Sequence, residues 1–257
     1  MARLSLTRLP HRTVKTWHGP SSRFLPRRTS AIVAVSALLA LTAACGNGGG
    51  GQPAPTSGNQ FTNPGFEEGR DPWFALKPPD FILSEDQAHA GDASALLEFQ
   101  ASQSEEGTKI SYLVQEIQPE EFPEVLSGYY RVDNWEKGTR KQYLQFVVIV
   151  FGAANLPGEL SNHQIRYILA GIDSPPFGID NAHFIFDSKE DPPVGEWVKF
   201  EHNVREDFVR LWGAAPEGYA NIRVLFEVRY DDKSPEEGPI RADVYYDDLY
   251  FGPAPTG

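Results

Sequence analysis

The sequence predicts an all-β domain, a two-sheet antiparallel sandwich with one short helix. The chain has 257 residues, of which 23 are glycine and 21 proline, and 12% are aromatic, a composition typical of turn-rich β proteins. From residue 61 onward, hydrophobic side chains recur at every second position rather than at helical spacing. Clusters of Gly, Pro, Asn and Asp separate these runs and end the strands. Many strands with almost no helix between them indicate a sandwich or a barrel.

Eight runs rich in Val, Ile, Tyr and Phe are expected to be strands. They are residues 95–100, 110–118, 126–134, 142–151, 165–172, 182–187, 221–230 and 242–251. Residues 126–134 and 221–230 alternate most clearly, so each should have one face in the core and one face toward solvent or a ligand. Residues 142–151 are apolar on both faces from Phe146 onward, which predicts a central strand. The one expected helix is 205–212, with Asn203 as its N-cap.

The first 44 residues have the features of a signal peptide. They contain seven basic residues and no acidic one, and residues 31–44 form an apolar run. This run is too short to span a bilayer but matches the hydrophobic core of a signal peptide. Cys45, the only cysteine, follows directly, and the sequence before it resembles the lipobox of bacterial lipoproteins, in which the cysteine is acylated. Thr42 stands where a leucine is usual, which leaves cleavage after Ala44 with a free thiol as the alternative.

Residues 45–60 are expected to be the lipidated cysteine and a flexible tether. The segment is made of Gly, Pro and polar residues and cannot bury enough apolar surface to fold. The folded domain is expected at 61–252, with a tail at 253–257. These features predict an exported protein of the bacterial cell envelope, anchored by its lipid, with the domain outside the cytoplasmic membrane.

The charge distribution excludes one class of partner. The net charge is −12, and without the basic first 44 residues the remaining 16 basic and 35 acidic side chains give −19. Nonspecific binding to nucleic acids needs a basic surface. No nucleic-acid partner is therefore expected.

Three motifs lie near the ends of the expected domain. Residues 63–69 read NPGFEEG and are followed by Trp73, residues 88–97 read AHAGDASALL, and residues 245–251 read YYDDLYF. In their order and spacing they resemble CenC-type carbohydrate-binding modules, which are grouped with families four, nine and twenty-two. The resemblance implies a galactose-binding-like jelly roll whose first and last strands lie side by side. It also implies a carbohydrate or cell-wall glycan as the partner.

The same resemblance implies a structural calcium ion. In such jelly rolls a carboxylate of the opening motif often meets one of the closing motif at the ion. Glu67 and Asp247 are the expected ligands, with loop carbonyls near Gly91, because calcium takes six to eight oxygen ligands. Strand alternation would place Asp247 and Asp248 on opposite faces, so at most one of them should reach the ion. The alternative is that these acids are solvated or bonded to turn amides.

The polar faces of two strands supply candidate sugar-binding residues. A sugar site needs aromatic platforms and planar polar side chains on an exposed face. The candidates are Tyr129, Arg131 and Asp133, with Trp135 in the following turn, and Arg223, Glu227 and Arg229. This prediction requires both strands to lie on one concave sheet. The three arginines outnumber the two acids and favour an anionic glycan, and the alternative is a solvated face with cross-strand ion pairs.

No enzyme motif is complete, so the domain is expected to be non-catalytic. The sequence lacks the paired carboxylates of jelly-roll glycosidases and the usual hydrolase and metalloprotease motifs. Residues 164–167 read QIRY, whereas jelly-roll alginate lyases have Gln-Ile-His or Gln-Val-His, so Arg166 stands in place of the histidine. Two non-catalytic interpretations remain, and a polysaccharide lyase or glycosidase is a third, less favoured one. One is a carbohydrate-binding lipoprotein, and the other is a structural or adhesion lipoprotein without a sugar site.

Overall fold

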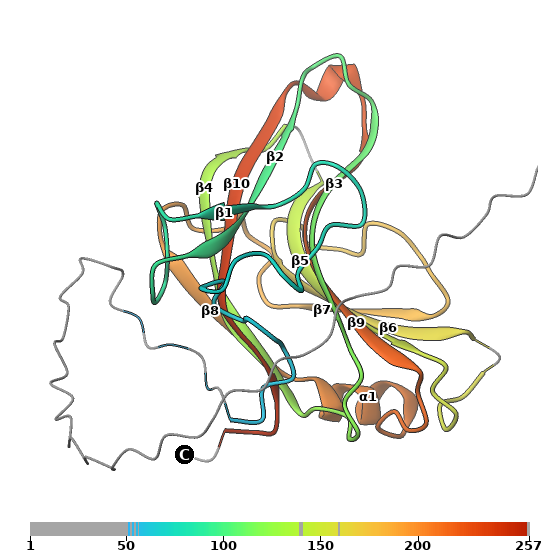
Figure 1. Ribbon diagram of the computed structural model, residues 1–257. Helices are drawn as coiled ribbons and strands as arrows, with labels where there is room; N and C mark the ends of the chain where they lie inside the picture. The colour runs from blue at the N-terminus through green and yellow to red at the C-terminus, as the bar shows by residue number, and fades with distance from the viewer. Residues whose placement is uncertain are drawn as a thin grey trace, which may run out of the picture. The chain divides into compact units, whose positions relative to one another are not determined.

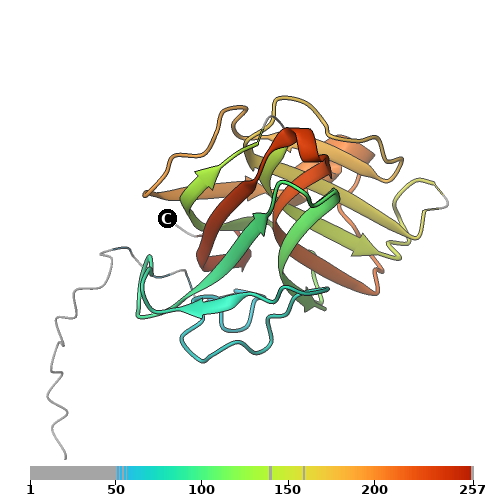
Figure 2. The same cartoon turned by 90° about the horizontal axis from the view of Figure 1, so that it is seen from above.

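The computed structural model describes residues 51, 53, 55, 57–138, 141–158 and 160–255. In this part of the chain, ten strands form two five-stranded sheets (Figures 1 and 2). The predicted signal peptide, residues 1–44, and the predicted lipidation site, Cys45, lie outside the described residues. Among the helices of the described ranges, none has the length and apolarity that crossing a bilayer requires.

Each sheet is named after its longest strand, β10 in one and β9 in the other. The β10 sheet has the order β1 (Ile82–Ser84), β2 (Ser94–Ala101), β10 (Ile240–Gly252), β4 (Val125–Glu136) and β8 (Trp197–Asn203). The β9 sheet has the order β3 (Gly107–Ile117), β9 (Asn221–Lys233), β5 (Gln142–Phe151), β6 (Asn162–Ala170) and β7 (Ala182–Phe186). The predicted two-sheet sandwich is confirmed, with β5 inside its sheet as expected. One pair differs, because β6 and β7 are parallel and are joined by a long connection.

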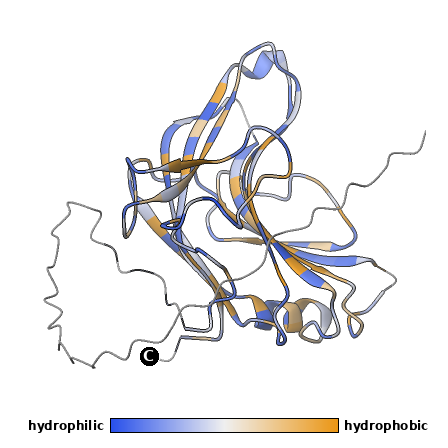
Figure 3. Ribbon diagram, viewed as in Figure 1, coloured by the Kyte–Doolittle hydropathy of each residue, from blue (hydrophilic) through white to orange (hydrophobic). Residues whose placement is uncertain are grey.

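The core lies between the inward faces of the two sheets. Hydrophobic and hydrophilic residues alternate along several of the strands (Figure 3). Phe146 of β5 is fully buried and stacks on Tyr167 of β6, with ring centroids 4.4 Å apart. Its ring also lies 5.3 Å from that of Phe200 on the opposite sheet. Aromatic contacts of this kind join the sheets, and buried rings of this size supply much of the hydrophobic stabilisation.

The opening segment runs beside the end of β10. The backbone N–H of Gln60 donates to the carbonyl of Phe251 at 2.8 Å, and that of Leu249 donates to the carbonyl of Pro64 at 3.0 Å. The Asn59 side chain bonds the backbone of Leu249 and Phe251. The two ends of the domain are therefore tied together, although the opening segment forms no regular strand.

In the described part of the chain there is one α-helix, α1 (Val204–Trp212), at the position expected for residues 205–212. Asn203 is the N-cap, and its side chain accepts a hydrogen bond from the Glu206 N–H at 3.0 Å. Gly213 ends the helix in the left-handed region, with φ of 87°. Phe208 is fully buried and its ring meets that of Phe122. The helix thus packs against the core. A short 3-10 helix, η1 (Pro235–Glu237), separates β9 from β10.

Candidate functional site

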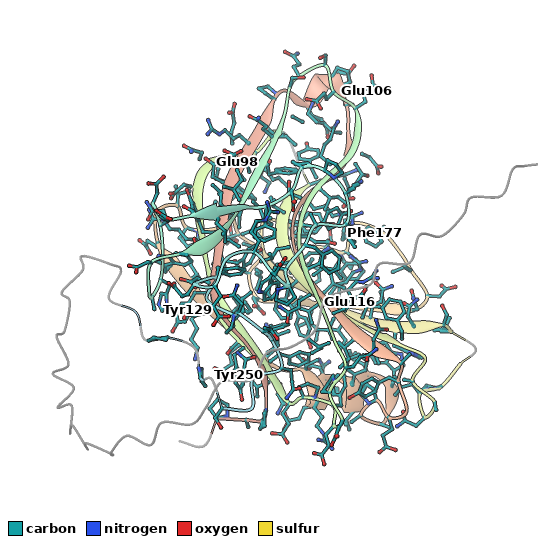
Figure 4. All side chains as sticks on the ribbon, in the orientation of Figure 1. Glu98, Glu106, Glu116, Tyr129, Phe177 and Tyr250 are labelled. Atoms are coloured by element: carbon teal, nitrogen blue, oxygen red, sulfur yellow. The ribbon has the colours of Figure 1, made fainter. Side chains whose placement is uncertain are left out.

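The predicted sugar-binding residues do not share one face. β4 belongs to the β10 sheet and β9 to the β9 sheet, so Tyr129 and the residues beside it face away from Arg223, Glu227 and Arg229. Tyr129 and Phe177, both labelled in Figure 4, lie on opposite sides of the sandwich. The prediction of one common sheet is wrong, because the pairing of strands far apart in sequence is not encoded in the alternation of either strand.

The four β4 candidates all have protein partners. The Tyr129 ring stacks on His89 with centroids 3.5 Å apart. Arg131 pairs with Asp133 at 3.3 Å and donates to the carbonyl of Gly195 at 2.7 Å. Trp135 packs against the core, since positive φ at the preceding residue interrupts the alternation. Arg131 and Asp133 are thus engaged by the protein, whereas Trp135 Nε1 is buried without a hydrogen-bond partner among the residues that the structure describes.

The outer face of the β9 sheet carries a buried polar cluster. We use this name for Tyr143, Gln145, Arg166, Glu227, Arg229 and Asp231. The strand register places Gln145 directly beside Glu227, and Tyr143 directly beside Arg229. Charged and amide side chains are rarely buried on a sheet face unless they are paired or serve a ligand.

Within the cluster, Asp231 has a full set of partners. Its carboxylate accepts a hydrogen bond from the Tyr143 hydroxyl at 2.7 Å and from Arg229 Nε at 2.8 Å. Burial raises the pKa of Tyr143 well above its ordinary value, and the neighbouring carboxylate adds to the rise. The hydroxyl therefore stays protonated and acts as a donor.

Glu227 is shared among three side chains. Its Oε2 accepts a hydrogen bond from Gln145 Nε2 and lies 4.0 Å from the nearest guanidinium nitrogens of both Arg166 and Arg229. Only 3% of Glu227 is exposed. A buried carboxylate without cations nearby would be costly, so the two arginines keep this site stable.

Three polar atoms of the cluster have no hydrogen-bond partner among the described residues, although one of them, Arg166 Nη1, lies within ion-pair distance of Glu227. They are Gln145 Oε1, Arg166 Nε and Arg166 Nη1. Arg166 makes one direct hydrogen bond, from Nη2 to Gln164 Oε1 at 3.0 Å. Burial lowers the pKa of Arg166, although Glu227 opposes this effect. Leaving a buried donor or acceptor unpaired costs about 1–3 kcal/mol, so such atoms call for an explanation.

An apolar strip borders the cluster on the same face. Val114, Leu225 and Val147 are direct neighbours on β3, β9 and β5, and they are buried. Ile110 and Ile149 are half-buried and pack against the same strip. The outer face of the β9 sheet thus combines polar groups with spare bonding capacity and an adjoining apolar surface.

Phe177, in the connection between β6 and β7, lies over the cluster. Its ring centroid is 5.2 Å from the Arg166 guanidinium carbon and 5.0 Å from that of Arg229. The ring also meets Phe184 of β7 edge-on, at 5.4 Å. These contacts cover the guanidinium groups with an aromatic face.

The predicted calcium ligands have other partners. Glu67 Oε1 accepts hydrogen bonds from the backbone N–H groups of Asp92 and Ala93, at 2.9 and 3.1 Å. Asp247 Oδ2 accepts from the N–H of His89 at 2.7 Å. Among the described ranges, no three acidic, His or Cys side chains are grouped to hold a metal ion. The N–H donors that these carboxylates accept from do not fit a calcium ion, which requires oxygen ligands, so the arrangement seen here is not that of the expected calcium site.

Asp247 and Asp248 face the same loop, which differs from the alternation expected for them. Asp248 has a φ of 50°, and the pairing of β10 with β4 shifts register between Asp247 and Tyr250. This bulge turns both carboxylates toward the loop around His89. Asp247 Oδ2 accepts from the His89 backbone, and Asp248 Oδ2 lies 2.6 Å from His89 Nδ1. An extra residue in a strand breaks the period of two, which sequence alternation cannot reveal.

Sequence reasoning missed most of the cluster. It identified Glu227 and Arg229 but not Tyr143, Gln145 or Asp231, and it considered Arg166 only as a departure from a lyase motif. A signal was present, because Gln145 and Arg166 are polar residues inside otherwise apolar strands. A polar residue at such a position is buried in a central strand and needs a partner. The sequence does not show that these positions are neighbours.

The sequence and the fold were compared with those of known proteins. No family model matches the sequence, and no curated protein matches it. Among solved structures, the chain is similar to TmCBM61 in complex with β-1,4-galactotriose, at 15% identity and a TM-score of 0.41, over 75% of this chain and 97% of that one. It is similar to the xylan-binding domain from CBM 22, at 13% identity and a TM-score of 0.44, over 79% and 99%. It is also similar to the C-terminal family 22 carbohydrate-binding module of Clostridium thermocellum Xyn10B, at 12% identity and a TM-score of 0.42, over 77% and 95%. Modules of this kind are what the opening and closing motifs resemble.

Proposed function

We propose that the chain is an exported, lipid-anchored protein whose sandwich domain binds a carbohydrate on the outer face of the β9 sheet without cleaving it. The observation that carries this proposal is the buried polar cluster with three unpartnered atoms. Most buried polar atoms have a hydrogen-bond partner in the protein or in water, and this cluster places three such free atoms on one sheet face. A polar ligand could form hydrogen bonds with the free donors of Arg166 and the free acceptor of Gln145.

The unused bonding capacity fits sugar hydroxyls. Arg166 offers two donor nitrogens, Nε and Nη1, and Gln145 offers one carbonyl acceptor. A hydroxyl both accepts and donates a hydrogen bond, so a neighbouring pair of hydroxyls would satisfy all three atoms. Ile149, which is half-buried beside the apolar strip, would meet the C–H face of the sugar ring. A carbohydrate thus matches both the polar atoms and the apolar part of the site.

A neutral glycan fits better than an anionic one. The expectation of an anionic glycan came from an excess of arginine, and the structure removes that excess. Arg131 pairs with Asp133, Arg223 with Glu116, and Arg229 with Asp231. Arg166 shares Glu227 with Arg229, so the cluster holds two cations and two carboxylates. An added carboxylate would leave a net negative charge in a buried site, which is costly.

Binding without cleavage follows from the use of the two carboxylates. Glycoside hydrolysis needs one acid and one base or nucleophile placed on either side of the sugar. Glu227 is bonded to Gln145, and Asp231 is bonded to Tyr143 and Arg229. Both carboxylates are occupied within the protein, and this supports a binding role.

Calorimetric titration of the mature protein with neutral and uronate oligosaccharides tests the proposal. We expect micromolar to millimolar affinity for a neutral glycan, roughly −4 to −8 kcal/mol, because hydrogen bonds between the glycan and the protein replace equally good bonds to water. Arg166→Ala should weaken binding by about 1–3 kcal/mol. Arg223→Ala is the matched control, since Arg223 lies on the same face but is paired with Glu116 near the edge, and it should bind as wild type does.

Two results would reject the proposal. Binding that Tyr129→Ala abolishes and Arg166→Ala leaves intact would move the site to the β10 sheet. A folded protein that binds no glycan would leave the structural or adhesion lipoprotein as the better account. A melting curve for each variant separates loss of binding from loss of fold.

A further inference from the structure

We propose that the connection between β6 and β7, residues 171–181, is a plug that occupies the glycan-binding face and must move before a glycan reaches Arg166 and Gln145. This inference rests on the proposed function, since it concerns access to the same site. Phe177 is the residue that closes the face.

The position of Phe177 follows from the strand register. Arg166 on β6 and Arg229 on β9 are separated by β5, which carries Gln145 between them. Neighbouring strands lie about 4.8 Å apart, so the two arginines stand on strands about 10 Å apart. The ring of Phe177 is 5.2 Å from one guanidinium and 5.0 Å from the other, and therefore lies between them over β5. A sugar that bonds Arg166 and Gln145 would need this space.

The plug is held mainly at its two ends. Gly171 donates from its N–H to the carbonyl of Glu190 at 2.8 Å, and its own carbonyl accepts from Lys137 Nζ at 2.7 Å. At the other end, the carbonyl of Asn181 accepts from the Gln164 N–H at 2.8 Å. Within the described part of the chain, no hydrogen bond joins residues 172–178 to the sheet. The middle of the plug is attached through Phe177, whose ring contacts Arg166, Arg229 and Phe184.

The structure offers space into which the plug can retreat. A cavity of about 510 Å³ is lined by residues 171–176 together with Lys137, Lys141 and Lys189. Its lining contains no residue of the polar cluster, so it is distinct from the space above Arg166 and Arg229. Gly178, next to Phe177, has no atom near the position of an added Cβ and is free to change conformation.

In the closed state, polar atoms beneath the Phe177 ring lack hydrogen bonds. Arg166 Nε and Nη1 and Gln145 Oε1 are buried and unpartnered while Phe177 covers the site. An aromatic face attracts a guanidinium but does not replace its hydrogen bonds. A glycan that displaces Phe177 would restore those bonds, so the ligand itself can drive the opening.

Arginine modification of the full-length protein tests the plug without any ligand. Phenylglyoxal labelling of Arg166 and Arg229, followed by mass spectrometry, compares wild type, Phe177→Ala and Phe177→Leu. Loss of two cation–π contacts should raise the labelling rate of both arginines about tenfold in Phe177→Ala. Phe177→Leu, which keeps an apolar cover, should give an intermediate rate. Ile179→Ala is the matched control, since Ile179 is exposed in the same connection, and it should label as wild type does.

Stopped-flow binding of a neutral oligosaccharide provides the second measurement. We expect about tenfold faster association for Phe177→Ala, because the binding face is already open. If Arg166 is labelled at the same rate in Phe177→Ala as in wild type, the plug is overturned. If Phe177→Ala in addition loses glycan binding, Phe177 is a stacking platform for the sugar and not a plug. If no variant binds any glycan, the proposed function fails, whereas the labelling rates still decide whether Phe177 closes this face. Far-UV circular dichroism confirms that each variant is folded.

Discussion

Asp247 is the residue whose chemistry departs most from that of an ordinary surface acid. It is fully buried at the loop around His89. Burial raises the pKa of Asp247 from 3.8 to about 8, the neighbouring Asp248 carboxylate adds to the rise, and the backbone N–H groups of His89, Asp248 and Ala90 oppose it. The folded protein therefore binds a proton at Asp247 more tightly than the unfolded chain does.

The raised pKa predicts an unusual pH dependence of stability. The contribution of Asp247 is fully present below about pH 4 and is lost as the pH rises through about 8. We expect the free energy of unfolding of wild type, relative to Asp247→Asn, to fall between pH 5.5 and 8.5. Urea unfolding at these two pH values in the presence of a chelator measures the difference. Glu85→Gln, at an exposed acid, should show no such trend, and a difference for Asp247→Asn that is flat or rises with pH would contradict the burial argument.

Calcium provides an independent test at the same residue. The carboxylates of Glu67 and Asp247 accept backbone N–H bonds, so we expect millimolar calcium to leave the melting temperature of the metal-stripped protein unchanged. An ion that binds only the folded state would raise it by mass action. A rise that Asp247→Ala abolishes would restore the ion that the opening and closing motifs imply.

At the scale of elements, Lys233 ties the connection between β2 and β3, which joins the two sheets, to the end of β9. It is 2% exposed, and its ammonium group donates to the backbone carbonyls of Gln103 and Glu105, both at 3.1 Å. These carbonyls lie in the turn between β2 and β3. One buried cation thus satisfies acceptors from a turn more than a hundred residues away in sequence.

Replacing Lys233 should destabilise the domain. Lys233→Met keeps the length of the side chain but leaves buried carbonyls unpaired, and we expect a loss of about 1–3 kcal/mol in the free energy of unfolding. Lys199→Met is the control, because Lys199 is exposed and its ion pair with Glu201 contributes little. Urea unfolding curves compare the two variants, and an equal effect of both would show that the turn is not anchored in this way.

The strands could be predicted much better than the way they pair. Alternation identified eight of the ten strands, because a half-buried strand repeats every second residue. It missed β1, which has three residues, and β8, where Val198 and Phe200 alternate with charged residues over too short a span to stand out. Pairing depends on contacts between distant segments, so the placement of Tyr129 and Glu227 on different sheets required the structure. The buried cluster was missed for the same reason.

At the scale of the whole molecule, the domain and its anchor are expected to act as separate parts. The anchor rests on the sequence before Cys45, and the tether has no other hydrophobic segment. We expect wild type to partition into detergent and Cys45→Ser to be released or to stay unprocessed, since one acylated cysteine provides the membrane attachment. Phase partitioning of both forms measures this, and equal solubility would contradict the anchor.

The central claim is that a glycan binds the outer face of the β9 sheet, and mapping the bound glycan by NMR tests it most directly. The spectra of the isotope-labelled mature protein are followed during titration with the best-binding neutral oligosaccharide. We predict that the largest chemical-shift changes occur at the side chains of Gln145 and Arg166 and at the backbone around Phe177. Shift changes confined to Tyr129, Arg131 and Asp133 on the β10 sheet would contradict it.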